Sequence, residues 1–229
     1  MTLPQPAFGT LYLVPTPLDF GCDTVLPVTQ TLAQDTIQIA AHLPHWISEN
    51  AKSTRAFLKR VGEVMPLAQP IQDIVIQELP REVHKKGDHR GEFDAKHLLA
   101  AAQQGHDIGL ISEAGMPAIA DPGSSVVRAA HELGLRVVPL VGPVSLMLAL
   151  AASGLNGQHF AFVGYLPQEA SARQQRLREL ESLAHKTGQT QIFIETPYRN
   201  AALWDALLKG LQPHTRLALA SGLTLPHMQ

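Results

Sequence analysis

Short apolar runs alternate along the chain with longer segments in which apolar residues recur at helical spacing. This alternation is typical of βα units, whose strands assemble into a mainly parallel sheet. We therefore predict an α/β fold of two domains, the first an open, mainly parallel sheet and the second a smaller mixed sheet. The predicted strands are residues 11–14, 46–48, 74–77, 108–112 and 137–140 in the first domain, and 160–164, 191–194 and 217–220 in the second.

The helices between these strands have recognisable ends. Asp121 and Pro122 precede a helical pattern that Gly134 ends, which predicts a helix over residues 124–133 with Asp121 as its N-terminal cap. Apolar periodicity predicts further helices around residues 53–58, 94–104 and 144–152.

The length of 229 residues suits two small domains. Turn-forming residues 153–157 (SGLNG) follow an apolar helix and precede a new strand, so we predict domains of residues 1–154 and 155–229. The segment 80–92 contains the densest group of basic residues and is predicted to be an exposed loop.

Composition narrows the functional classes. With 45% hydrophobic and 17% charged residues the chain should fold, and its net charge of -2 excludes a general basic field for nucleic acid, so any RNA contact must be local. The single cysteine, Cys22, forms no internal disulfide, and no Cys/His spacing indicates a metal site. No signal-peptide pattern is present, and the longest apolar stretch is shorter than the ~20 residues of a membrane span, so we expect a cytoplasmic protein without membrane contact.

Three loops that follow predicted strands are rich in Gly, Pro and small residues: 14–17, 112–123 and 141–145. In an open α/β sheet, ligands bind beyond the carboxyl ends of the strands. Small residues there let the backbone approach a ligand closely, which suits an adenosyl group with an amino-acid tail. The phosphate-binding motifs of nucleoside triphosphate and dinucleotide sites are missing. Alternatively, Gly and Pro serve only to make tight turns.

Together with residues 9–17 (GTLYLVPTP) and 193–199 (FIETPYR), these loops resemble the tetrapyrrole (corrin/porphyrin) methylase superfamily. The most similar branch methylates a ribose 2′-hydroxyl of ribosomal RNA in the small subunit. The resemblance implies two α/β domains, a homodimer, and S-adenosylmethionine bound in the cleft between the domains. By motif position it implies cofactor contacts from Pro15, Gly115, Met116, Ile119, Ala120, Ser145, Glu195 and Thr196.

The chain departs from the ribosomal RNA branch on the expected substrate side. Residues 18–21 (LDFG), 48–55 (SENAKSTR) and 77–80 (QELP) replace segments that read IGNL, AEDTR and HEHN in that branch. These differences concern the methyl acceptor more than the cofactor. The chain also ends soon after the strand predicted at 217–220, where family members usually continue through another strand, so a truncated second domain is one expectation.

Methyl transfer is an in-line displacement that needs alignment and, for a hydroxyl acceptor, a nearby proton acceptor. The candidate carboxylates are Glu49, Glu113 and Glu195, and no metal is required. The fork geometry of Arg55 and Arg199 suits phosphate recognition, although structural ion pairs are an alternative. Lys85, Lys86 and Arg90 are expected to contact the substrate from a lid; the alternative is a solvated loop without a partner.

Three functions remain open. The leading one is S-adenosylmethionine-dependent methylation of a ribose hydroxyl in ribosomal RNA. The second is methylation of a small molecule, which the negative net charge and the altered substrate segments favour. The third is a non-catalytic S-adenosylmethionine-binding protein, which the missing substrate segments and the early end of the chain would explain.

Overall fold

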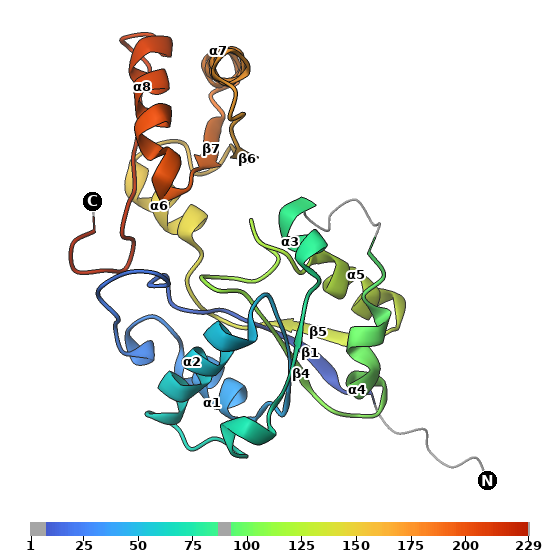
Figure 1. Cartoon of the computed structure of the whole chain (residues 1–229). Coiled ribbons are helices and arrows are strands. Elements are labelled where there is room, and N and C mark those ends of the chain that lie inside the picture. The colour runs from blue at the N-terminus through green and yellow to red at the C-terminus, as the bar shows by residue number, and fades with distance from the viewer. Residues whose placement is uncertain (1–7, 87–92, 229) are drawn as a thin grey trace. The chain divides into compact units, whose positions relative to one another are not determined.

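The computed structural model describes residues 8–86 and 93–228, without the side chains of residues 84–86. The chain forms two compact units, one of Met1–Val144 with Thr224–His227 and one of Ser145–Leu223 with Met228–Gln229. Both are α/β, which confirms the predicted fold class (Figure 1). Each unit is described by itself.

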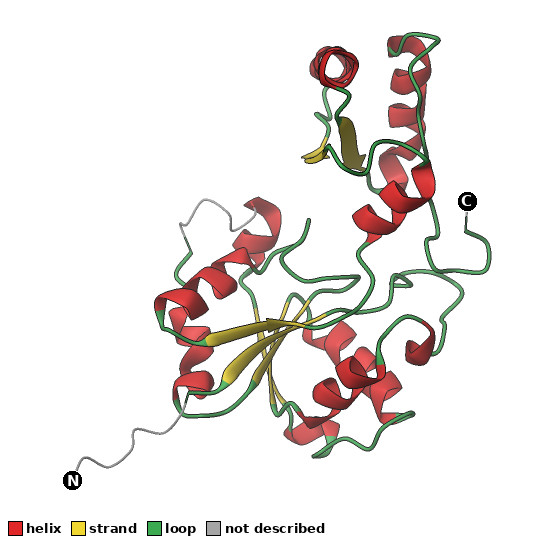
Figure 2. Ribbon diagram, turned by 180° about the vertical axis from the view of Figure 1, so that it is seen from behind, coloured by secondary structure: helices red, strands yellow, loops and turns green. Residues whose placement is uncertain are grey.

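The first unit is built on a five-stranded sheet of order β3-β2-β4-β1-β5, and all its strand pairs are parallel. Figure 2 shows helices on both faces of this sheet. The strands are β1 (Thr10–Val14), β2 (His45–Ser48), β3 (Val75–Glu78), β4 (Ile108–Ile111) and β5 (Arg136–Pro139).

Two apolar clusters hold this sheet between its helices. Neighbouring side chains of one strand point to opposite faces, so Trp46 joins one cluster and Ile47 the other. All of β4 is buried, as expected for a central strand covered on both sides. One cluster lies under α1 (Gln34–His42) and α2 (Ala51–Gly62), and the other lies under η3 (Lys96–Leu99), α4 (Ala100–Gln103) and α5 (Ser124–Glu132).

The order of the strands determines where a ligand can bind. The connections from β1 to β2 and from β2 to β3 run through α1 and α2 on one face. Those from β3 to β4 and from β4 to β5 run over the other face. In the sheet, β4 lies between β2 and β1. The chain leaves β4 toward one face of the sheet, and it leaves both neighbouring strands toward the other face. Such a switch opens a crevice beyond the carboxyl ends of the strands, here centred on β4.

The second unit contains a two-stranded parallel sheet of β6 (Phe160–Tyr165) and β7 (Thr190–Ile194). Its helices are α6 (Ser145–Ser153), α7 (Ala170–Thr187), η4 (Pro197–Arg199) and α8 (Asn200–Gly210). The Glu169 carboxylate begins α7 by accepting hydrogen bonds from the backbone of Ser171 and Ala172. Leucines of α7 and α8 pack with Leu166 into a small core.

Two predictions about the second unit differ from the structure. The sheet is parallel rather than mixed, since its two strands, β6 and β7, pair in parallel, and residues 217–220 form no strand; Leu217 and Leu219 are 42% and 70% exposed. An apolar run becomes a strand only where another strand accepts and donates its backbone hydrogen bonds. The division between the units falls between Val144 and Ser145 rather than after residue 154, because α6 clusters with the second unit.

Two local predictions about the first unit are also wrong. Gly123, not Asp121, is the N-terminal cap residue of α5. The segment expected to be a loop from residue 80 begins instead with α3 (Arg81–Lys86), which buries Val83. Among the described residues, no helix is long and apolar enough to cross a membrane.

Candidate functional site

The loops after β1 and β4 are joined at the sheet edge. Thr16 and Gly115 exchange two backbone hydrogen bonds, of 2.9 and 3.1 Å. The buried Thr16 hydroxyl also donates to the Ser112 carbonyl at 3.3 Å. Thr16 therefore fixes the start of the glycine-rich loop 112–123 against the end of β1.

Two glycines bring these loops and the loop after β5 close together. Gly115 has φ +78°, and a β-carbon there would lie 3.1 Å from Leu18 and 3.5 Å from the Pro143 carbonyl oxygen. A β-carbon on Gly142 would overlap the ring of Pro15, which is itself buried. Pro15 and Gly115, both predicted to contact the cofactor, thus hold the three loops together.

The tip of loop 112–123 has a strained backbone and an apolar surface. Ala118 and Ala120 adopt φ of 64° and 65°, a left-handed conformation that costs a residue with a β-carbon roughly 1–2 kcal/mol. Such strain is concentrated at ligand-binding sites. Ile119 is 43% exposed, Ala120 is exposed and Met116 is half-buried. A loop that presents backbone and small apolar side chains fits an adenosyl group.

Three carboxyl groups gather at this edge. Because Ser48 pairs with Ile111, the chain leaves β2 and β4 at neighbouring points, with Glu49 after one strand and Glu113 soon after the other. Burial raises the pKa of Glu49 to about 8, with the charges of Asp121 and Glu113 adding to the rise. Burial also raises the pKa of Asp121 to about 6, again with Glu113 adding.

Glu49 therefore keeps its proton at neutral pH for most of the time, unlike an ordinary carboxyl group. Perturbed carboxyl groups of this kind are typical of sites that transfer protons. Sequence reasoning missed Asp121 as a site residue, because it assigned this carboxylate to the N-terminal cap of the following helix. Among the described side chains, no three of His, Cys, Asp and Glu are placed to hold a metal ion.

The first turn of α2 lies at the same edge because it follows β2. Its free amides are satisfied by two side chains: Asn50 accepts from Lys52 and Ser53, and Glu78 accepts from the Ala51 amide at 2.6 Å. The candidate Arg55 lies exposed on this helix. Its contact with a substrate stays a prediction.

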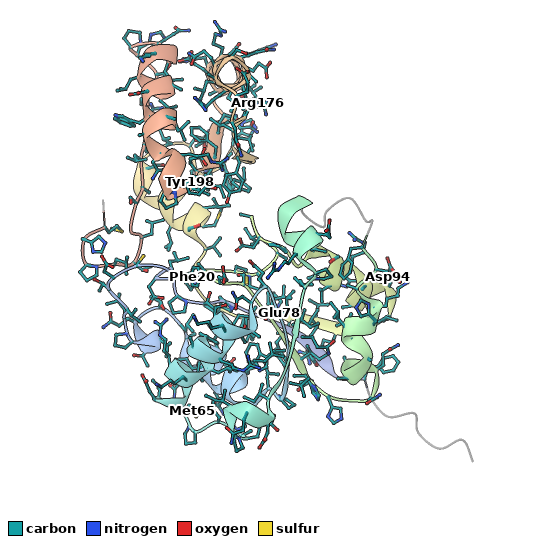
Figure 3. The ribbon with its side chains drawn as sticks, viewed as in Figure 1. Phe20, Met65, Glu78, Asp94, Arg176 and Tyr198 are labelled. Carbon is teal, nitrogen blue, oxygen red and sulfur yellow. The ribbon has the colours of Figure 1, made fainter. Side chains whose placement is uncertain are left out.

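In the second unit, Glu195 and Arg199 bind each other. The Arg199 Nε lies 2.7 Å from a Glu195 carboxylate oxygen, and that oxygen also accepts from the Thr196 amide at 2.7 Å. Glu195 is consequently a weaker candidate for proton acceptor than Glu49. The Arg199 guanidinium carbon lies 5.7 Å from the Tyr165 ring centre and 5.6 Å from that of Tyr198, the exposed tyrosine labelled in Figure 3.

The other predicted contacts divide between the two units and the undescribed segment. Ser145 is the exposed first residue of α6 in the second unit. Arg90 lies outside the described residues, as do the side chains of Lys85 and Lys86. The predicted substrate lid therefore stays a prediction.

Comparison with known proteins gives a family match. Residues 33–229 match the family described as Tetrapyrrole (Corrin/Porphyrin) Methylases. The chain is similar to proteins named Ribosomal RNA small subunit methyltransferase I. In Mesorhizobium japonicum the identity is 32%, covering 96% of this chain and 65% of the relative. In Escherichia coli O157:H7 it is 30%, covering 94% and 66%, and in Halalkalibacterium halodurans 34%, covering 87% and 60%. The chain thus spans about two thirds or less of these relatives.

Proposed function

Because the chain belongs to the tetrapyrrole (corrin/porphyrin) methylase family, we propose that it is an S-adenosylmethionine-dependent methyltransferase. We propose as its acceptor a ribose hydroxyl of ribosomal RNA in the small subunit, because its relatives are named methyltransferases of that RNA. One observation carries the proposal: beyond β4, at the edge of the first unit's sheet, an apolar, backbone-lined loop lies beside carboxyl groups of raised pKa.

The cofactor would lie against the loop tip formed by Met116, Ile119 and Ala120, with Pro15 and Gly115 holding that loop in place. S-adenosylmethionine supplies a methyl group on a positively charged sulfur. A neutral, apolar surface carries no charge that would attract or repel this positively charged sulfur. Contacts from Ser145, Glu195 and Thr196 rest on the resemblance alone.

Glu49 is the proposed proton acceptor for the hydroxyl. A carboxylate whose pKa is about 8 accepts a proton more readily than an ordinary carboxylate, once it is ionised. Burial is the largest cause of this high pKa, and the negative charges of Asp121 and Glu113 add to it. In this role Asp121 and Glu113 act through Glu49 and touch no substrate.

A second copy of the chain and the RNA are the proposed partners. The second unit exposes apolar side chains on two helices, Met147 and Leu148 on α6 and Trp204 and Leu208 on α8. Exposed apolar surface of this kind suits burial in a homodimer. A ribosomal RNA substrate would place the protein in the cytoplasm.

The test is transfer of label from S-adenosylmethionine to undermethylated small ribosomal subunits and, separately, to a soluble metabolite extract. We expect label in ribonuclease-sensitive material, at a rate that rises with pH through about 8. Glu49→Gln should lower the rate by about 100-fold or more, whereas Glu63→Gln, an exposed carboxyl at the other end of α2, should not. Label in the metabolite extract alone would reject the RNA acceptor. Cofactor binding without transfer to either pool would reject the enzyme.

A further inference from the structure

Two tyrosine rings surround an arginine whose charge is already neutralised. The Glu195 carboxylate that pairs with Arg199 is 7% exposed, and the Arg199 Nε also lies 3.1 Å from the Thr196 hydroxyl. An arginine held by a buried internal carboxylate attracts a phosphate weakly, because the pair has no net charge. The planar face of its guanidinium still attracts aromatic rings, and both tyrosine ring centres lie within 6 Å of it.

The outer ring of this group is open to solvent. Tyr198 is 82% exposed and Tyr165 is 51% exposed. An exposed side chain ordinarily loses conformational freedom when it binds a partner. Here the contact with Arg199 restrains the Tyr198 ring beforehand, and Pro197 stiffens the short helix η4 on which Tyr198 lies. Tyr198 is thus both exposed and pre-organised.

A restrained, open aromatic ring fits a planar π system. Unpaired bases in RNA are recognised largely by stacking on aromatic side chains and arginine planes. We propose that Tyr198, with Arg199 and Tyr165 behind it, is a stacking platform for an unpaired base of the RNA substrate. The inference rests on the proposed RNA acceptor and assigns a binding role to two tyrosines outside the carboxyl group cluster. Stacking needs no net charge, which agrees with the overall charge of -2.

The test is the affinity of the full chain for a short unpaired RNA oligonucleotide, followed by fluorescence anisotropy. Tyr198→Ala should weaken binding by about 5- to 100-fold, the loss of one base–aromatic stack. Tyr198→Phe keeps the ring and should bind like the parent. Phe160→Ala removes another exposed ring of the same unit, 38% exposed at the start of β6, and is the matched control that should also bind like the parent. The slope of log affinity against log salt should be unchanged in Tyr198→Ala, because no phosphate contact is lost.

Three results would overturn the platform. The first is parental affinity in Tyr198→Ala, and the second is equal loss in Tyr198→Phe, which would assign binding to the hydroxyl. The third is a loss of S-adenosylmethionine affinity in Tyr198→Ala, which would assign the ring to the adenine of the cofactor. If the parent protein methylates RNA but the Tyr198 variants give one of these three results, the proposed function stands and only the stacking platform is rejected. If the parent neither binds nor methylates RNA, both fail.

Discussion

Arg60 on α2 binds Asp19, in the loop after β1, through both terminal nitrogens, at 3.0 and 2.7 Å. The same guanidinium donates to the Leu26 carbonyl at 2.6 Å. The Asp19 side chain is 5% exposed and that of Arg60 23%. Asp19 belongs to the segment that departs from the ribosomal RNA branch, so this pair holds that loop in its present form.

Removing one partner should destabilise the first unit. Asp19→Ala would leave the Arg60 charge partly buried without its carboxylate, and we expect the free energy of unfolding to fall by about 2–4 kcal/mol. Urea denaturation measures this change. Lys59→Ala, at an exposed position beside Arg60, should change stability by less than about 0.5 kcal/mol. Equal stability of the two variants would contradict the role given to the pair.

Gly115 and Gly134 form a matched comparison for the site. Both have positive φ, +78° and +70°, but a β-carbon at Gly134 would meet nothing within 4 Å. Gly134→Ala should therefore cost about 1 kcal/mol from backbone strain and leave cofactor affinity intact. Gly115→Ala should cost more, because Leu18 must also move, and should weaken S-adenosylmethionine binding measured by calorimetry. Unchanged affinity in Gly115→Ala would separate this loop from the cofactor.

The raised pKa of Glu49 predicts a pH-dependent stability. The ordinary value is 4.5 and the folded value about 8, so between these pH values the folded state binds more protons than the unfolded state. The contribution of Glu49 is fully present below about pH 4.5 and is lost as the pH rises through about 8. Glu49→Gln should gain stability over the parent by about 1–2 kcal/mol at alkaline pH, less than the full shift because the carboxyl is partly open to water. Urea denaturation at several pH values would show no such trend if Glu49 ionises normally.

The predicted contacts of the basic residues with the substrate have their own test. If Lys85, Lys86 and Arg90 contact RNA phosphates, replacing all three with alanine should reduce the slope of log affinity against log salt by up to about three units. Cofactor affinity should not change. An unaltered slope and affinity would identify the segment as a solvated loop and favour a small-molecule acceptor.

The proposed homodimer predicts a light-scattering mass of twice the 24.8 kDa chain. Trp204→Glu combined with Leu208→Glu would place charges on the exposed apolar side of α8 and should favour the monomer. A parent that stays monomeric at high concentration would exclude the dimer.

The sequence by itself determined the α/β class, the strands of the first sheet and the loops that hold the candidate site. The central strand β4 is apolar because both its faces are covered, and this pattern is local enough to locate the strand within a few residues. A parallel sheet then places every strand's carboxyl end at one edge. For that reason loops 14–17 and 112–123, far apart in the chain, could be expected at one site.

Only the tertiary structure decided what individual residues do there. Among the three candidate carboxylates, it distinguished Glu49 from Glu195, because Glu195 pairs with Arg199 whereas Glu49 is half-buried near Asp121. It also left residues 217–220 without a partner strand. Hydrophobic periodicity depends on neighbours in the sequence, but desolvation, charge interactions and strand pairing depend on neighbours in space, which no local pattern specifies.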